Sequence, residues 1–271
     1  MKIKSIVKYN IGSLKKSILI YYCVFIAICA LSTIFAYKFN GTISSSGIEL
    51  SSAIFIFVVG LNVFKENFYF IKANNLSRKS YFYGTVLSMV PISIGMSFID
   101  LILNRIYNIF IKQPHFSTAL LSLHTIFVNC PTNYDMIYTD YVNIWNYANN
   151  GWVQSNSLET LFNTFLFQVS VYLMVFLLGF VITMLYYKCN KLMKTVISII
   201  PILLIIVFNM IFNMMVLSFP YLLGKISEVL FYILGILPRN VYMTISTFSI
   251  TSVALAAVAY LLIRKMTIKQ K

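Results

Sequence analysis

The stretch LFNTFLFQVSVYLMVFLLGFVITMLYY, residues 161–187, contains no charged side chain over 27 positions. An α-helix rises 1.5 Å per residue, so about 20 apolar residues cross the roughly 30 Å hydrocarbon layer of a bilayer. The stretch therefore predicts a transmembrane helix. It also predicts that lipid, rather than water, is the solvent around much of the chain.

The composition of the whole chain agrees with this prediction. Of its 271 residues, 59% are apolar and 10% are charged, whereas soluble domains average about 45–50% apolar and about 25% charged residues. The mean hydropathy is +0.83. These values exclude a soluble enzyme, a disulfide-stapled secreted domain and a disordered chain, and they indicate an integral membrane protein.

Six stretches predict an all-α, polytopic fold, with residues 1–271 forming a single transmembrane domain. The six are residues 18–37, 50–64, 84–103, 161–187, 196–217 and 241–263. The second is the weakest, because Glu49 precedes it and Lys65-Glu66 follow it. It is retained because the alternation of charge between loops requires a span there.

The basic residues indicate the orientation of the spans. Lys and Arg accumulate in loops that stay in the cytoplasm. With the N-terminus inside, 16 of the 21 basic residues fall in inner segments, and none lies between Lys112 and Lys188. The pattern predicts six spans with both termini in the cytoplasm.

Residues 2–16 predict an amphipathic interfacial helix. At 100° per residue, apolar side chains such as Ile3, Ile11 and Leu14 share one side, and the five lysines occupy the other. Such a helix lies in the headgroup plane, where lysines attract anionic lipid. A simple positive anchor for the first span is an equal alternative. A cleaved signal is disfavoured, since the apolar run exceeds the usual 7–15 residues.

The inner loop, residues 65–83, combines basic and aromatic side chains. Ser77 is a candidate N-cap for a short helix that begins at Arg78 and Lys79. This composition suits docking to another protein. The alternative is a positively charged stop with aromatic belt residues.

Two outer segments differ from simple loops. Residues 113–158 hold both tryptophans and both histidines and predict a long extracellular segment. Residues 218–240 are apolar but interrupted by Pro220, Gly224, Gly235 and Pro238. This second segment predicts a re-entrant hairpin between the fifth and sixth spans, covered by protein because irregular backbone is not tolerated against lipid.

No catalytic, cofactor or metal site is predicted. The dipeptides Lys-Ser and Lys-Thr do not follow a Gly-rich phosphate-binding turn, so the chain is not expected to bind and hydrolyse ATP in that way or to be an enzyme. His115 and His124 have no nearby Glu. The four cysteines lie too far apart, or on different sides, to predict a disulfide or a metal site.

Few polar groups fall within the spans. Asp100 and Asn104 are four residues apart, as are Asn209 and Asn213, and they are expected to hydrogen-bond across helix or subunit interfaces, with substrate contact as the alternative. The seven carboxylates are scattered, and Glu49 is placed outside. No pair is expected in mid-membrane, so the ion relay of coupled carriers is not predicted.

The order of these parts resembles the type-2 ATP-binding-cassette (ABC) permeases. Residues 64–68, FKENF, and 74–84, NNLSRKSYFYG, are similar to the "FKE-F…NG-SRKT-F-G" loop of small Firmicute permeases, which include relatives of phenol-soluble-modulin and peptide-antibiotic exporters. Asn75-Leu76 stands where that family often has a Gly. The resemblance implies that the loop is a coupling helix that contacts the ATPase through Asn75, Ser77, Arg78, Lys79 and Tyr81.

The resemblance also implies the partners. They are a separate cytoplasmic ABC ATPase and a second permease subunit, identical or homologous, in a bacterial plasma membrane, with no nucleic acid and no cofactor. The expected cargo is an amphipathic peptide or lipid-like toxin. Three alternatives stay open: an ion-coupled carrier, a membrane-embedded enzyme, and an immunity or sensor protein that binds peptide through residues 113–158 without transport.

Overall fold

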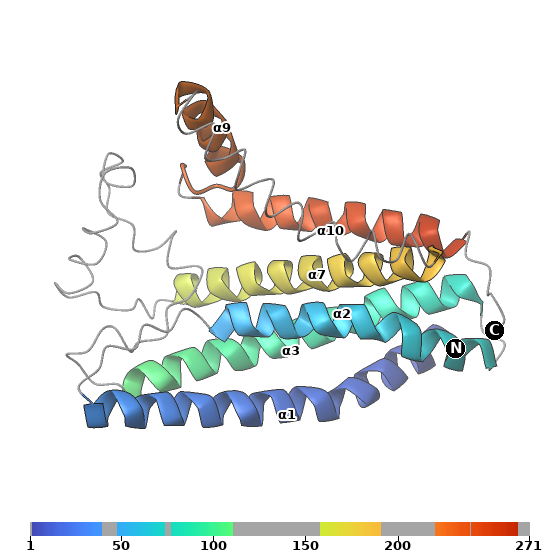
Figure 1. The fold of residues 1–271 in the computed structure, drawn as a ribbon, viewed down its shortest axis with the longest axis horizontal. Helices are drawn as coiled ribbons and strands as arrows, with labels where there is room; N and C mark the ends of the chain where they lie inside the picture. Colours follow the sequence, from blue (N-terminus) through green and yellow to red (C-terminus); the bar gives the residue numbers. More distant parts are fainter. Residues whose placement is uncertain are drawn as a thin grey trace. The chain divides into compact units, whose positions relative to one another are not determined.

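The computed structural model describes residues 2–39, 48–73, 77–110, 158–190, 220–238 and 240–264. Within these ranges the chain forms helices and no strand, which confirms the all-α prediction there. The helices are α1 (Lys2–Phe39), α2 (Ile48–Ala73), α3 (Arg78–Phe110), α7 (Leu158–Lys188), α9 (Pro220–Ile233) and α10 (Val241–Arg264) (Figure 1).

Four described helices are long and apolar enough to cross a membrane. They contain the stretches Ile3–Leu31, Arg78–Tyr107, Leu158–Lys188 and Val241–Arg264. Four of the six predicted spans lie within these helices. The apolar part of α2, Glu49–Phe64, is shorter. Three predicted features lie outside the described residues: the span at residues 196–217, most of the outer segment 113–158, and Asn75.

The N-terminal region is helical without a break. The expected interfacial helix and first span form one continuous helix, α1, of 38 residues. At 1.5 Å per residue it is about 57 Å long, nearly twice the hydrocarbon thickness. Residues 2–39 contain no proline, and the single Gly12 is insufficient to end a helix. Backbone continuity therefore joins two segments that the charge pattern separates.

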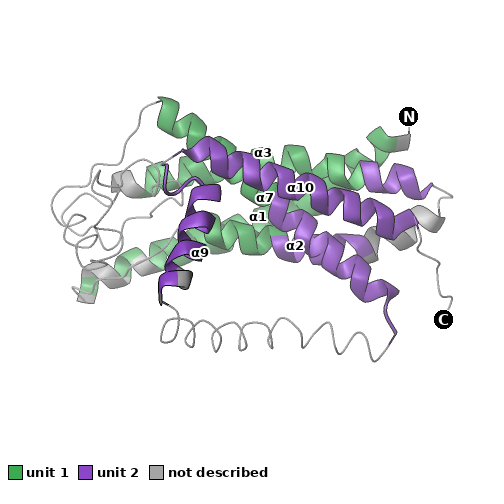
Figure 2. Cartoon of the chain, turned by 90° about the horizontal axis from the view of Figure 1, so that it is seen from above, with its two compact units in different colours: residues 1–56, 84–173 green, residues 57–83, 174–271 purple. Residues whose placement is uncertain are grey.

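The chain divides into two compact units (Figure 2). Unit 1 comprises residues 1–56 and 84–173. Its interior holds many polar side chains, whereas exposed positions on α1 and α3, such as Leu19, Ile28 and Phe98, are large and apolar. Water-soluble proteins favour the opposite distribution, so the arrangement is that of helices surrounded by lipid.

Unit 2 comprises residues 57–83 and 174–271. In it, α2 and α7 approach so closely that glycines are required at the contact. A Cβ on Gly60 would lie 2.4 Å from the carbonyl oxygen of Phe176, and one on Gly179 would lie 2.5 Å from that of Phe57. Small residues allow this backbone approach between membrane helices.

The segment predicted as a re-entrant hairpin, residues 218–240, contains α9 and a turn that leads into α10. Gly235 has φ of 70° in this turn, a conformation that favours glycine. The Asn240 side chain then accepts a hydrogen bond from the Tyr242 amide at 3.0 Å and caps α10. Gly235 lies in the turn after α9, but Gly224 lies inside α9 and does not interrupt it.

Candidate functional site

Two predicted sites can be located: the start of α3 in unit 2 and the polar residues of α3 in unit 1. At the first, Ser77 caps the helix as expected. Its hydroxyl accepts a hydrogen bond from the Ser80 amide at 3.1 Å, and its carbonyl accepts one from the Tyr81 amide at 3.0 Å. The helix is not short, however, because it continues as α3 to Phe110.

The basic residues of this segment are exposed, and its aromatic residue is not. Arg78 and Lys79 are exposed, and a guanidinium nitrogen of Arg78 donates a long hydrogen bond of 3.5 Å to the carbonyl oxygen of Arg264 at the end of α10. Tyr81 is fully buried. Its side chain therefore supports the helix from inside, and it is Arg78 and Lys79 that are available to a partner.

The Tyr81 ring lies in a cluster that joins three helices of unit 2. Its centroid is 6.1 Å from that of Phe64 on α2 and 6.4 Å from that of Phe180 on α7. Phe64 and Phe180 are 6.1 Å apart in an edge-on arrangement, the geometry that aromatic quadrupoles favour. The start of α3 is thereby attached to α2 and α7.

In unit 1, Asp100 occupies the centre of a buried polar cluster. It is 0% exposed. One carboxyl oxygen accepts a hydrogen bond from the Tyr22 hydroxyl of α1 at 2.8 Å, and the other accepts one from the Tyr172 hydroxyl of α7 at 2.5 Å. Hydrogen bonds to both oxygens satisfy a group that is otherwise costly to bury.

A second chain of hydrogen bonds begins one helical turn away on α3. The Ser97 hydroxyl donates to the side-chain oxygen of Gln168 at 2.9 Å. The Gln168 amide then donates to the Glu49 carboxyl at 2.5 Å. This chain connects α3 and α7 to the first turn of α2, and all three side chains are buried.

The cluster brings together residues that sequence position separates. Glu49, assigned to the outer side as an isolated carboxylate, is 2% exposed and shares a buried interior with Asp100. The burial of the Glu49 carboxyl group in unit 1 was not expected from the sequence. Asn104 is also buried, one turn beyond Asp100. Asn209 and Asn213 lie outside the described residues.

The sequence does not predict three members of this site: Tyr22, Tyr172 and Gln168. Tyrosines in membrane helices usually anchor at the interface, so a tyrosine within a span gives a weak signal. The stronger signal was on α3, where Ser93, Ser97, Asp100 and Asn104 recur every three or four residues and mark one face.

The hydrogen bonds of the cluster connect α7 to α2 and to α3. In the described part of the chain, no three His, Cys, Asp or Glu side chains come together as metal ligands. The chain matches no family model, no curated protein and no solved structure.

Proposed function

We propose that this chain is the permease subunit of a type-2 ABC exporter, powered by a separate cytoplasmic ATPase. Two such subunits, identical or homologous, would form the pathway in a bacterial plasma membrane. Each would have six spans, cytoplasmic termini and the hairpin of residues 218–240 re-entering from outside. The cargo would be an amphipathic peptide or lipid-like toxin, because the spans contain many aromatic residues and methionines and few charges.

The observation that supports this proposal best is the charge at the start of α3. Arg78 and Lys79 occupy its first turn, which contains no acidic residue. The helix N-terminus carries a partial positive charge, and each cation there is disfavoured by roughly 0.3–1 kcal/mol. Two exposed cations at this position do not favour the helix itself, and they are well placed for an acidic groove on a partner.

The packing at the same end of α3 would transmit a displacement to α2 and α7 within unit 2. Tyr81 couples it to Phe64 and Phe180, and the contacts of Gly60 and Gly179 hold α2 against α7. A displacement of Arg78 and Lys79 would therefore move parts of α2 and α7 together. ATP-driven closure of the ATPases would cause this movement of α2 and α7 and so favour an outward-facing state.

Charge reversal tests the proposal. Arg78→Glu and Lys79→Glu, singly and together, are expected to reduce co-purification with the ABC ATPase of the native host and to abolish ATP-dependent export. Lys16→Glu, which reverses an exposed lysine of α1, is the control and should leave both unchanged. Undiminished ATPase binding and export in the double variant would refute the proposal.

A second candidate, an ion-coupled carrier, is favoured by one observation: Asp100 and Glu49 are both buried in unit 1. Ionisable groups inside membrane bundles often mark ion pathways. Asp100→Asn distinguishes the two functions in liposomes. Loss of a gradient-driven transport that needs no ATPase would support the carrier, whereas retained ATP-driven export would support the permease.

A further inference from the structure

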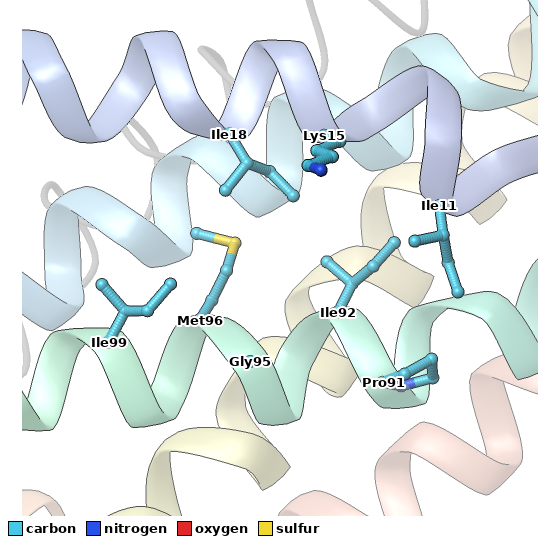
Figure 3. A pocket seen from close by; sticks show the side chains of 8 residues that line it. All are labelled: Ile11, Lys15, Ile18, Pro91, Ile92, Gly95, Met96 and Ile99. Carbon is cyan, nitrogen blue, oxygen red and sulfur yellow. The ribbon is translucent and has the colours of Figure 1, made fainter.

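A groove of about 220 Å³ lies between α1 and α3 in unit 1 (Figure 3). Ile11 and Ile18 extend from α1 toward α3, and the side chains of Ile92 and Met96 extend back toward α1 (Figure 3). Ile92 and Met96 are buried and form the floor. The walls are therefore branched or flexible apolar side chains.

Gly95 keeps this groove open. A Cβ at this position would meet no atom within 4 Å, so packing inside the chain does not require glycine there. Glycine is among the least favourable residues for a helix interior. A larger side chain at position 95 would fit the chain but would fill part of the groove.

Lys15 is the one charged residue among those that line the groove. It is exposed, as are Lys4, Lys8 and Lys16 of the same helix. A lysine stem packs along apolar surface while its ammonium group reaches the polar boundary. The groove thus combines an apolar slot with a cation at its edge and with no lining carboxylate.

We propose that this groove binds one anionic phospholipid, with part of an acyl chain lying over Gly95 and the phosphate beside Lys15. The volume is below the roughly 300–1,000 Å³ of pockets that enclose drug-sized ligands, and an α-helix is 10–12 Å across. The groove therefore accommodates a segment of a hydrocarbon chain rather than a peptide helix. The proposal holds whether or not the chain is an ABC permease.

Photocrosslinking tests the site. The purified full-length protein is reconstituted with phosphatidylglycerol or phosphatidylcholine carrying the same photoreactive acyl chain, and labelled peptides are identified by mass spectrometry. Phosphatidylglycerol is expected to label peptides containing Ile18, Ile92 or Met96 preferentially. Gly95→Leu should reduce this labelling several-fold. Gly12→Leu, which also meets open space but does not line the groove, should not.

The headgroup is tested separately. Lys15→Gln should lower the ratio of phosphatidylglycerol to phosphatidylcholine labelling about fivefold, the factor expected from one lysine near an anionic lipid. Lys16→Gln removes the adjacent exposed charge and should leave the ratio unchanged. If Gly95→Leu fails to fold, judged by helicity and size-exclusion profile, the lysine pair alone decides the proposal.

Three results would overturn the proposal: equal labelling by the two lipids, equal effects of the Lys15 and Lys16 variants, or labelling that survives Gly95→Leu in a folded protein. Displacement of the lipid label by a second copy of the chain, seen as crosslinks between subunits at Ile92 or Met96, would show that a protein interface covers the groove and would also overturn it.

Discussion

Removing the Tyr172 hydroxyl isolates one hydrogen bond to the buried Asp100. In Tyr172→Phe the ring remains, so its packing is retained, but Asp100 loses the donor at 2.5 Å. The Tyr22 bond at 2.8 Å remains. The variant therefore tests whether this carboxyl group holds α3 and α7 together.

The expected loss can be bounded. Hydrogen bonds to charged groups contribute about 1.5–3 kcal/mol in soluble proteins, whereas side-chain hydrogen bonds between membrane helices average about 0.6 and reach about 1.7 kcal/mol. Asp100 and Tyr172 are both buried, at 0% and 1% exposure, which favours the upper membrane value. We expect Tyr172→Phe to lower the free energy of unfolding by about 1–2 kcal/mol.

A double-mutant cycle assigns this loss to the pair. Asp100→Leu removes the acceptor and leaves the Tyr172 hydroxyl buried without it, so Tyr172→Phe should then be neutral or stabilising. Unfolding is followed by circular dichroism in mixed micelles with increasing sodium dodecyl sulfate. Tyr232→Phe, at an exposed tyrosine of α9, is the control and should change the free energy of unfolding by less than about 0.5 kcal/mol.

A Tyr172→Phe variant no less stable than Tyr232→Phe would contradict a stabilising bond between Tyr172 and Asp100. So would an equal effect of Tyr172→Phe with and without Asp100, because the hydroxyl would then act through some other neighbour. Either result would leave the bond between Tyr172 and Asp100 without a role in joining α3 and α7.

Three further contacts are tested by the same unfolding measurement. Gly60→Ala should lower the free energy of unfolding by about 1–3 kcal/mol, because its Cβ would lie 2.4 Å from a backbone carbonyl oxygen. Gly12→Ala is the control: its Cβ would meet open space, so the substitution should stabilise α1 by up to about 1 kcal/mol. Ser77→Ala should cost about 1 kcal/mol by removing the cap of α3, seen also as faster amide hydrogen exchange in its first turn. Gln168→Leu should cost about 1–3 kcal/mol, because Glu49 loses a buried donor. Gln168→Glu should not restore stability at a pH at which both carboxyl groups are ionised, since two carboxylates repel each other and neither can donate a hydrogen bond.

The four long apolar helices among the described residues could be predicted from sequence alone. In a bilayer the backbone N–H and C=O groups must hydrogen-bond to one another, because no water is present. An apolar run long enough to span the bilayer is therefore expected to be helical. Residues 161–187 accordingly lie within α7, Leu158–Lys188. Local chemistry also determined the start of α3 at Ser77 and the turn at Gly235, because a cap and a positive φ depend on a few neighbouring residues.

Which polar side chains meet could not be predicted from sequence, because it depends on how the helices pack. Asp100 bonds Tyr22, 78 residues away, and Tyr172, 72 residues away, while Glu49 bonds Gln168, 119 residues away. Helical periodicity reveals the polar face of α3 but does not specify how far neighbouring helices are shifted or rotated against it. Those shifts depend on the packing of whole surfaces, and they convert isolated polar residues into one buried cluster.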